Sequence, residues 1–412
     1  MAGPLPPAAR WSAFVGPTWA ETDLDAVADN VRAVLALLPP ACRLMAVVKA
    51  DAYGHGAVEV ARTSVEAGAA ALGVSTVAEA LQLREAGIDA PVLVFTPLSA
   101  DVLPAALDLG LTATVVDLAG ARALAAAAAA SNAMAVAHVK CDTGMGRYGW
   151  TAADLCAAAP ELAGLGASVR WEGIYTHFAR AGEARHGRAQ LDRLLAAAAA
   201  CERAGLRFAV RHAASSRAVL ALPEAHLDMV RVGGLLYGDA PPGTGFRRAF
   251  ALRVRVAQVR ELPPGATVGY GGEWRVPAGA PACVATLPVG WADGLGLGPS
   301  APFRRPGVLL RALAGAVLRA LGLRRGAAAG EVTLGGRVVP VVGRMGMQQV
   351  TVACGGLSVA PGDTATAHAA PTSVSARVPR VFVRDGAPVI ARSPAGAAEP
   401  AGGLGRSAGA NA

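Results

Sequence analysis

The sequence predicts an α/β protein with two domains: a (β/α)8 TIM-type barrel and, after it, a mostly β C-terminal domain. Two observations carry this prediction. Before residue 240, eight short apolar runs alternate with amphipathic helical stretches, and eight βα units imply a closed parallel barrel. After about residue 249 the pattern changes to β-type runs broken by turns.

The predicted barrel strands are short runs rich in Val, Ala and Leu. They lie at Leu44–Lys49, Ala71–Ser75, Pro91–Phe95, Thr112–Val116, Ala135–Lys140, Val169–Tyr175, Phe208–His212 and Met229–Gly233. Stretches between them, such as Thr76–Ala86 and Arg188–Ala204, place apolar residues three and four apart, as helices packed on a sheet do.

The domain boundaries follow from these patterns. We expect an N-terminal segment at 1–17 that could pack with the C-terminal domain, a barrel at 18–248 and a β domain at 249–387. The β domain contains the apolar runs Ala251–Glu261, Cys283–Val289, Val332–Val342 and Gln349–Val352. Residues 388–412 are dominated by Gly, Ala, Ser and Pro, which predicts a disordered tail.

Composition argues against several classes of partner. The net charge of +8 comes from arginines spread along the chain, whereas nucleic-acid binding needs a concentrated basic face. The six cysteines form no CxxC pair, so we expect neither a metal site nor a disulfide framework. The N-terminus lacks the pattern of a signal peptide and the Ala-rich runs are too short to span a bilayer. We therefore predict a cytoplasmic protein without membrane or nucleic-acid contacts.

Polar residues follow several predicted barrel strands at their C-terminal ends, where barrel enzymes place their active sites. They are Lys49, Lys140, His177, Ser215, Ser216, Arg231, Gly233 and Gly234. Lys49 and Lys140 are the only lysines in the chain. Because arginine replaces lysine as a surface charge but not as an amine nucleophile, Lys49 is a candidate nucleophile; the alternative is a strand-end lysine that reaches solvent.

The segment Val47–Gly56, with the sequence VVKADAYGHG, resembles the lysine signature of alanine racemases, which are fold type III enzymes dependent on pyridoxal 5'-phosphate (PLP). Other segments agree with this family in its order along the chain. They are Pro17–Asp25, Leu83–Gly87, Lys140–Arg147, Tyr175–Ala179, Met229–Gly233 with Tyr237-Gly238, and Gly269–Gly271.

The resemblance implies roles for individual residues. Lys49 would bind PLP covalently and act as one base, and Tyr270 would be the second base, donated by the partner subunit of a homodimer that shares its active sites. For the cofactor, it implies a contact of Arg231 with the pyridine nitrogen, His177 beside the ring, and a phosphate site at Tyr53, Ser216, Gly233 and Gly234. For the substrate, it implies contacts at Arg147 and Met347. Lys140 would support Arg147, and in some members of the family this lysine is carbamylated. The implied reaction interconverts L- and D-alanine and supplies D-alanine for cell-wall precursors.

The C-terminal domain departs from the family pattern. Gln348 stands where the family has aspartate, Trp291 where it usually has tyrosine, and Ser215 replaces an amide near the cofactor. All five tyrosines are accounted for, at positions 53, 148, 175, 237 and 270, so none remains for the family's tyrosine after the Met-Asp segment. Three alternatives stay open: a racemase of alanine, a racemase of serine or another amino acid in a specialised pathway, and a PLP-binding paralogue without turnover.

Overall fold

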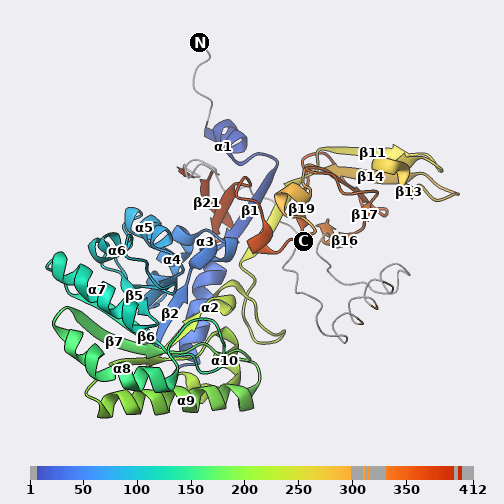
Figure 1. Ribbon diagram of the computed structural model, residues 1–412. Coiled ribbons are helices and arrows are strands. Elements are labelled where there is room, and N and C mark those ends of the chain that lie inside the picture. Colours follow the sequence, from blue (N-terminus) through green and yellow to red (C-terminus); the bar gives the residue numbers. More distant parts are fainter. Residues whose placement is uncertain are drawn as a thin grey trace. The chain divides into compact units, whose positions relative to one another are not determined.

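A computed structural model describes residues 7–297, 310, 314, 317, 331–393 and 398–400. The chain divides into two compact units, each described by itself below (Figure 1). One unit spans Asp23–Ala249, and the other combines the chain up to Thr22 with the chain from Phe250 onward.

The unit Asp23–Ala249 is a closed barrel of parallel strands, which confirms the predicted fold (Figure 1). Its strands are β2 (Arg43–Val47), β3 (Ala71–Val74), β4 (Val92–Val94), β5 (Thr112–Val115), β6 (Ala135–Lys140), β7 (Val169–Tyr175), β8 (Val210–His212) and β9 (Met229–Val232). The barrel closes where β2 pairs with β9, with Met45 opposite Arg231. All eight predicted strands are present, with ends shifted by at most a few residues.

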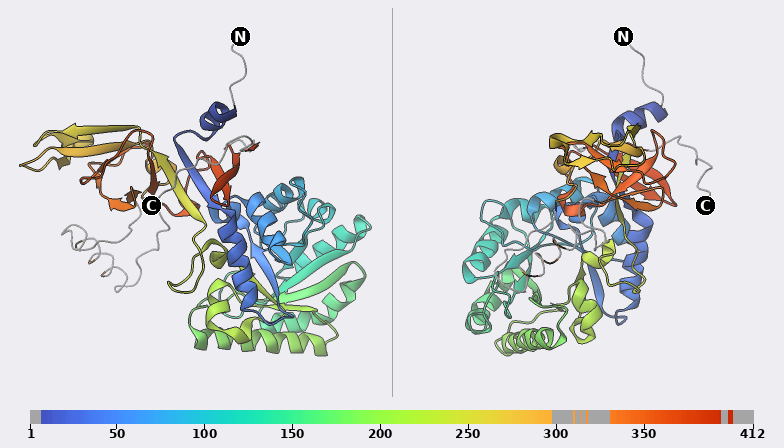
Figure 2. Two further views of the ribbon diagram at one scale, coloured as in Figure 1. Left: turned by 180° about the vertical axis from the view of Figure 1, so that it is seen from behind. Right: turned by 90° about the vertical axis from the view of Figure 1, so that its right-hand side faces the viewer.

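Helices cover the outside of the barrel strands, as Figure 2 shows from two further directions. They are α2 (Leu24–Ala36), α3 (Lys49–Gly54), α4 (Ala57–Glu66), α5 (Val77–Glu85), α6 (Leu103–Asp108), α7 (Leu118–Ala130), α8 (Ala152–Gly164), α9 (Ala184–Arg203) and α10 (Ser216–Ala221). Side chains of Asp23, Thr76, Asp117 and Thr151 accept hydrogen bonds from the first turns of α2, α5, α7 and α8. No helix in the described part of the chain is long and apolar enough to cross a membrane.

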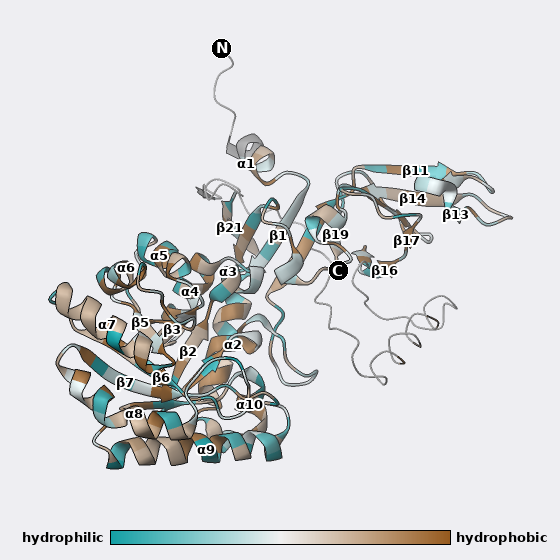
Figure 3. Ribbon diagram, viewed as in Figure 1, coloured by the Kyte–Doolittle hydropathy of each residue, from teal (hydrophilic) through white to brown (hydrophobic). Residues whose placement is uncertain are grey.

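The inside of the barrel has an apolar part and a polar part. Met45, Ala71, Leu93, Val210 and Met229 form a buried apolar cluster on β2, β3, β4, β8 and β9. Brown, apolar stretches along β2 and α2 are visible in Figure 3. Buried polar side chains lie on β5 to β9 instead: Thr114, His138, Tyr175, His212 and Arg231. Burying a polar group without a hydrogen bond is costly, so hydrogen-bond partners for these side chains are expected inside the barrel.

The second unit is mostly β, as predicted. An eight-stranded sheet has the order β16-β15-β19-β10-β1-β20-β21-β22, and a four-stranded sheet has the order β11-β14-β18-β17. Among these strands are β1 (Thr18–Asp23), β10 (Phe250–Arg255), β11 (Gln258–Leu262), β14 (Ala282–Leu287), β15 (Val332–Leu334), β16 (Arg337–Val339), β17 (Val341–Val342), β18 (Val350–Ala353), β19 (Thr364–Ala367), β20 (Arg380–Arg384), β21 (Ala387–Arg392) and β22 (Ala398–Pro400). A small hairpin joins β12 (Thr267–Val268) and β13 (Trp274–Arg275), and α1 (Pro7–Val15) precedes β1.

Two boundaries differ from those predicted. Strand β1, placed in the barrel by the sequence analysis, pairs antiparallel with β10, with Trp19 opposite Arg253. Strands β21 and β22 occupy part of the expected disordered tail, because β21 pairs with β20 and β22 pairs with β21. Residues 394–397 and 401–412 of that tail lie outside the described residues.

The chain leaves β2 through an unusual turn, α3, in which Ala50, Asp51, Ala52 and Tyr53 have φ between 51° and 57°. Four consecutive left-handed residues, none of them glycine, are strained by about 1–2 kcal/mol each. The turn is held by the Asp51 carboxylate, which accepts a hydrogen bond from the Ala57 N–H at 2.8 Å. It is held as well by Tyr237, whose ring lies 5.1 Å from that of Tyr53.

Replacing Ala50 by glycine should therefore stabilise the protein. Ala50 is exposed, so the change removes left-handed strain with little loss of packing, and we expect the free energy of unfolding to rise by about 1 kcal/mol. Chemical denaturation measures this change. Ala196→Gly, at an exposed position in the right-handed helix α9, is the matched control and should destabilise by about 1 kcal/mol. Equal effects of the two substitutions would contradict the strained turn.

Candidate active site

A cavity of about 450 Å³ opens at the C-terminal ends of the barrel strands. Ten residues singled out in the sequence line it: Lys49, Tyr53, Lys140, Arg147, His177, Ser215, Ser216, Arg231, Gly233 and Gly234. The structure thus brings together every predicted site residue that belongs to the barrel unit.

Lys49 lies two residues beyond the end of β2, at the start of the left-handed turn. Its side chain faces the cavity and the residue is half-buried. Burial lowers the pKa of the Lys49 ammonium, and the Arg147 guanidinium lowers it further. The neutral amine that a nucleophilic lysine needs is therefore more accessible here than at an ordinary surface lysine.

The left-handed turn also places the Tyr53 hydroxyl beside Gly233. A Cβ atom at position 233 would lie 2.7 Å from the Tyr53 oxygen, so only glycine fits there. The Ser216 hydroxyl accepts hydrogen bonds from the backbone N–H groups of Gly233 and Leu235, at 3.2 and 3.3 Å. Tyr53, Ser216, Gly233 and Gly234 line the cavity together, and two hydroxyls beside a glycine backbone that a ligand can approach closely fit a phosphate group.

Arg231 is buried at the centre of the barrel, with 4% of its surface exposed. Its guanidinium donates to the Thr176 carbonyl at 2.6 Å, the Ala213 carbonyl at 3.2 Å and the His212 ring at 2.9 Å. Burial lowers the Arg231 pKa to about 10, so the group stays cationic at neutral pH. Because guanidinium only donates hydrogen bonds, it fits a ring nitrogen that accepts one, such as an unprotonated pyridine.

Lys140 and His177 flank Arg231 in the cavity. Burial and the neighbouring cations Arg231 and Arg147 lower the Lys140 pKa to about 8. Burial, together with repulsion from Arg231 and the other neighbouring cations, lowers the His177 pKa to about 3, so this ring is neutral. The Lys140 ammonium lies 5.0 Å from the centre of the Tyr175 ring, over its face.

The charges that line the cavity are mostly positive. Five cationic residues line it, Lys49, Lys140, Arg147, Arg217 and Arg231, together with one carboxylate, Asp239. Among the described residues, none of the acidic side chains forms an ion pair with Arg147, which is exposed. A surplus of fixed cations attracts anions, so the cavity suits a ligand with phosphate and carboxylate groups.

Tyr270 and Met347 belong to the second unit. Tyr270 follows β12, is 73% exposed and is flanked by glycines with φ of 75°, 73° and 58° at positions 269, 271 and 272. Met347 is 56% exposed and its carbonyl accepts a hydrogen bond from Ala292 at 3.0 Å. Both side chains thus face outward from their own unit.

The two substituted positions of the C-terminal domain lie beside Met347. Trp291 is 47% exposed, and its backbone N–H donates to the Gly346 carbonyl at 3.2 Å. Gln348 is exposed and follows Met347 in the same loop. These two departures from the family pattern therefore lie on the surface next to a predicted substrate contact.

Sequence reasoning missed several residues of the site. Tyr175 lines the cavity and donates to or accepts from Thr114 at 2.9 Å. His138 and His212 are buried side by side, with Nδ1 of His138 2.8 Å from Nε2 of His212. The signal that could have found His138 is a histidine within the apolar run Ala135–Lys140, because a buried polar ring requires partners.

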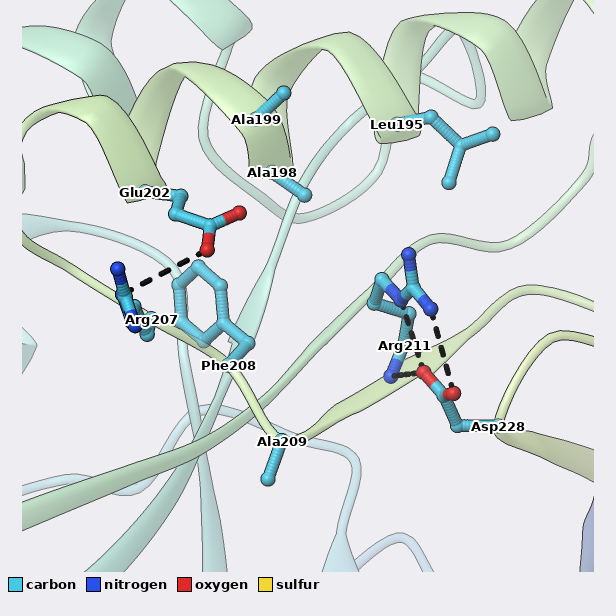
Figure 4. A pocket seen from close by; sticks show the side chains of 9 residues that line it. All are labelled: Leu195, Ala198, Ala199, Glu202, Arg207, Phe208, Ala209, Arg211 and Asp228. Atoms are coloured by element: carbon cyan, nitrogen blue, oxygen red, sulfur yellow. Dashed lines mark hydrogen bonds and ion pairs between the residues drawn. The ribbon is translucent and has the colours of Figure 1, made fainter. Parts of the chain in front are cut away.

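A second hollow, also of about 450 Å³, lies elsewhere on the barrel, beside α9 and β8 (Figure 4). Its charged side chains are paired with one another: Arg211 binds Asp228 at 2.9 Å, and Arg207 lies 3.6 Å from Glu202. None of the predicted site residues lines it. Because its charges are already neutralised, the hollow presents neither a nucleophile nor an unpaired cation.

Two family models match the chain. "Alanine racemase, N-terminal domain" matches residues 22–241, and "Alanine racemase, C-terminal domain" matches residues 249–306. The first covers all eight barrel strands, and the second covers the beginning of the chain that follows the barrel unit.

Known relatives agree with these models. The alanine racemase of Desulfosudis oleivorans is 46% identical over 297 residues, which is 67% of this chain and 75% of that protein. Alanine racemase 2 of Caldanaerobacter subterraneus subsp. tengcongensis is 35% identical over 347 residues, 82% of this chain and 81% of that protein.

Solved structures extend the likeness over both units. The alanine racemase of Clostridium difficile 630 has a TM-score of 0.79 at 27% identity, covering 92% of this chain and 99% of that one. The alanine racemase of D-cycloserine-producing Streptomyces lavendulae has a TM-score of 0.76 at 33% identity, covering 89% and 97%. This chain therefore belongs to the alanine racemase family of PLP-dependent isomerases, as the resemblance in its sequence implied.

Proposed function

We propose that the chain interconverts L- and D-alanine by a two-base mechanism, with Lys49 and Tyr270 of the partner subunit as the bases, and supplies D-alanine for cell-wall precursors. The main support for this proposal is that Lys49, Arg231 and the phosphate-type cradle formed by Tyr53, Ser216 and Gly233 line one cavity. Tyr270, which is 73% exposed on the other unit, is available to a neighbouring molecule.

PLP, when bound, withdraws electrons from the Cα of an attached amino acid and so acidifies the Cα proton. The protein side divides the remaining work. Lys49 holds the cofactor and moves a proton on one face, and Tyr270 moves a proton on the opposite face. Two bases on opposite faces invert the configuration, because the proton returns from the side opposite to the one from which it left.

Arg231 would donate a hydrogen bond to the cofactor's ring nitrogen. Its pKa of about 10 in this buried place keeps it protonated, so it offers a fixed cation rather than a transferable proton. Arg231 would thereby keep that nitrogen unprotonated and would moderate the electron withdrawal that PLP supplies.

Arg147 is the proposed ligand of the substrate carboxylate, since its exposed guanidinium lies near both lysines and electrostatically affects each of them. Lys140, whose pKa is lowered to about 8, loses its proton more readily than an ordinary lysine and would support Arg147 as its carbamate. Met347 would contact the substrate from the second unit.

A homodimer with shared active sites accounts for the exposed side chains of the second unit. Tyr270, Trp291 and Met347 are large side chains that are 73%, 47% and 56% exposed. A two-fold symmetric dimer would bury the same surface of both subunits and bring each Tyr270 toward the cavity of the other subunit. A cytoplasmic location stays a prediction.

The substituted loop around Met347 is the reason to keep a second candidate substrate. Gln348 and Trp291 border Met347, where the family has aspartate and usually tyrosine. If this loop reaches the cavity of the partner, the change from carboxylate to amide alters the charge near the substrate. Turnover of serine or another amino acid is the second candidate, and a PLP-binding paralogue without turnover is the third.

Lys49→Ala should abolish the visible absorbance of lysine-bound PLP and lower racemisation by at least about 10²–10⁴-fold, because it removes both the covalent attachment and one base. Lys49→Arg is the matched variant that keeps the charge but cannot attach the cofactor. Absorbance spectra and chiral analysis of alanine measure both effects. Full activity in either variant would contradict the role of Lys49.

Mixing the inactive variants Lys49→Ala and Tyr270→Phe should restore activity if the active site is shared. A mixed dimer contains one site with both Lys49 and Tyr270, so random exchange of subunits should yield about a quarter of the wild-type activity. Racemisation is measured before and after subunit exchange. Mixtures of Lys49→Ala with the double variant Lys49→Ala/Tyr270→Phe must stay inactive. No recovery in the first mixture would place both bases in one subunit.

A further inference from the structure

A row of polar side chains continues from Arg231 through the inside of the barrel, and the proposed reaction does not use it. His212 lies on β8, His138 on β6 and Glu172 on β7. The two rings are 0% and 3% exposed, whereas the Glu172 side chain is 33% exposed. The row therefore connects the cavity side of the barrel with a partly solvated carboxylate.

Each member of the row is within hydrogen-bond distance of the next. Arg231 Nη1 lies 2.9 Å from His212 Nδ1. His212 Nε2 lies 2.8 Å from His138 Nδ1, and His138 Nε2 lies 3.2 Å from the Glu172 carboxylate. Both nitrogens of both rings are thereby engaged.

The chemistry of the two ends fixes the direction of every bond. A guanidinium only donates, so His212 Nδ1 must accept, and the ring proton of His212 lies on Nε2. His138 Nδ1 then accepts that proton's hydrogen bond, and His138 Nε2–H donates to the carboxylate, which only accepts. Burial lowers the pKa of both imidazoles, so both are neutral. One proton arrangement satisfies the whole row.

The local fold is shaped around this row. The pairing of β6 with β7 shifts register between Ala137 and His138, so that Trp171 and Gly173 have partners and Glu172 is the extra residue of a bulge. Bulges re-aim side chains. A Cβ atom at Gly173 would lie 2.8 Å from three atoms of the His138 ring, so the ring occupies the space that a side chain would need.

The row also gives the buried guanidinium a distant counter-charge. In the described part of the chain, the hydrogen-bond partners of Arg231 are carbonyls and imidazoles, none of them a carboxylate. Glu172 supplies the negative charge, two rings away. A carboxylate in direct contact with Arg231 would compete for the guanidinium protons that we assign to the cofactor nitrogen. The two histidines of the row keep the Glu172 carboxylate away from Arg231.

We propose that His138 and Glu172 are positioning residues that act through His212 to hold Arg231 in one orientation and one hydrogen-bonding state toward the cofactor. This inference rests on the proposed contact of Arg231 with the ring nitrogen. His138 and Glu172 touch neither substrate nor cofactor, and their effect reaches the site through three consecutive hydrogen bonds.

Nitrogen-15 NMR of the imidazoles in the full-length protein without added PLP tests the proton arrangement directly. We expect His138 and His212 to be neutral, with the proton on Nε2 and an unprotonated Nδ1 that accepts a hydrogen bond. His138 is assigned by its close contact with the α protons of Gly173. A proton on Nδ1 of either ring, or two charged imidazoliums, would overturn the inference. This readout needs neither a variant nor activity.

Glu172→Gln tests the consequence for the reaction, since it keeps the shape of the side chain and removes its charge. We expect kcat for alanine to fall about tenfold, the order seen when supporting partners of a site residue are removed, with KM changed less than about twofold because Arg231 does not bind the substrate carboxylate. The His212 nitrogen shifts should change as well. Glu161→Gln breaks an exposed ion pair on the outside of the barrel and is the matched control.

The outcomes separate the inference from the proposed function. Equal kcat values in Glu172→Gln and Glu161→Gln, with unchanged His212 shifts, would refute the positioning role even if the wild type racemises alanine. The expected tautomers, together with altered His212 shifts in Glu172→Gln, would support the row even if the wild type were inactive on alanine. In that case the substrate assignment, and not the row, would be wrong.

Discussion

A cation buried without a carboxylate beside it is the constraint around which the barrel interior is arranged. Arg231 is 4% exposed, and its direct partners are two backbone carbonyls and two imidazoles. Burying a guanidinium is costly unless its donors are satisfied, so β5 to β9 carry polar side chains where β2 to β4 carry Met45, Ala71 and Leu93. The pKa values of Lys140 and His177 are lowered in part by the same cation.

The cavity joins this cation to a lysine and a phosphate-type cradle through one strained segment. The left-handed turn after β2 starts at Lys49 and ends with Tyr53 beside Gly233. Strain of this kind persists only where surrounding contacts determine it, and here the Asp51 carboxylate and the Tyr237 ring supply them. The turn and the contacts that support it therefore fix the position of Lys49 relative to the Tyr53 side of the cradle.

The barrel and most of its site residues could be predicted from the sequence, and the features that could not be predicted depend on contacts between distant parts of the chain. The barrel strands and eight rim residues follow from apolar runs and from what stands at their ends, since parallel strands share one rim. Tyr53 and Arg147 came instead from the family resemblance. The row from His212 to Glu172 could not be read, because it depends on a bulge and on which strands face each other across the barrel. Strand β1 was misplaced because strand propensity does not reveal the partner strand, which is β10. The pairing of β21 likewise overrides its Pro- and Ala-containing sequence.

Action of this barrel and its PLP-type site on alanine can be measured directly by incubating the PLP-loaded protein with a panel of L-amino acids in D2O. Deuterium at Cα and the D-enantiomer formed are both scored for each amino acid. We expect alanine to exchange fastest and to yield deuterated D-alanine. Exchange confined to another amino acid would contradict the substrate, and no exchange with any member of the panel would contradict catalysis altogether.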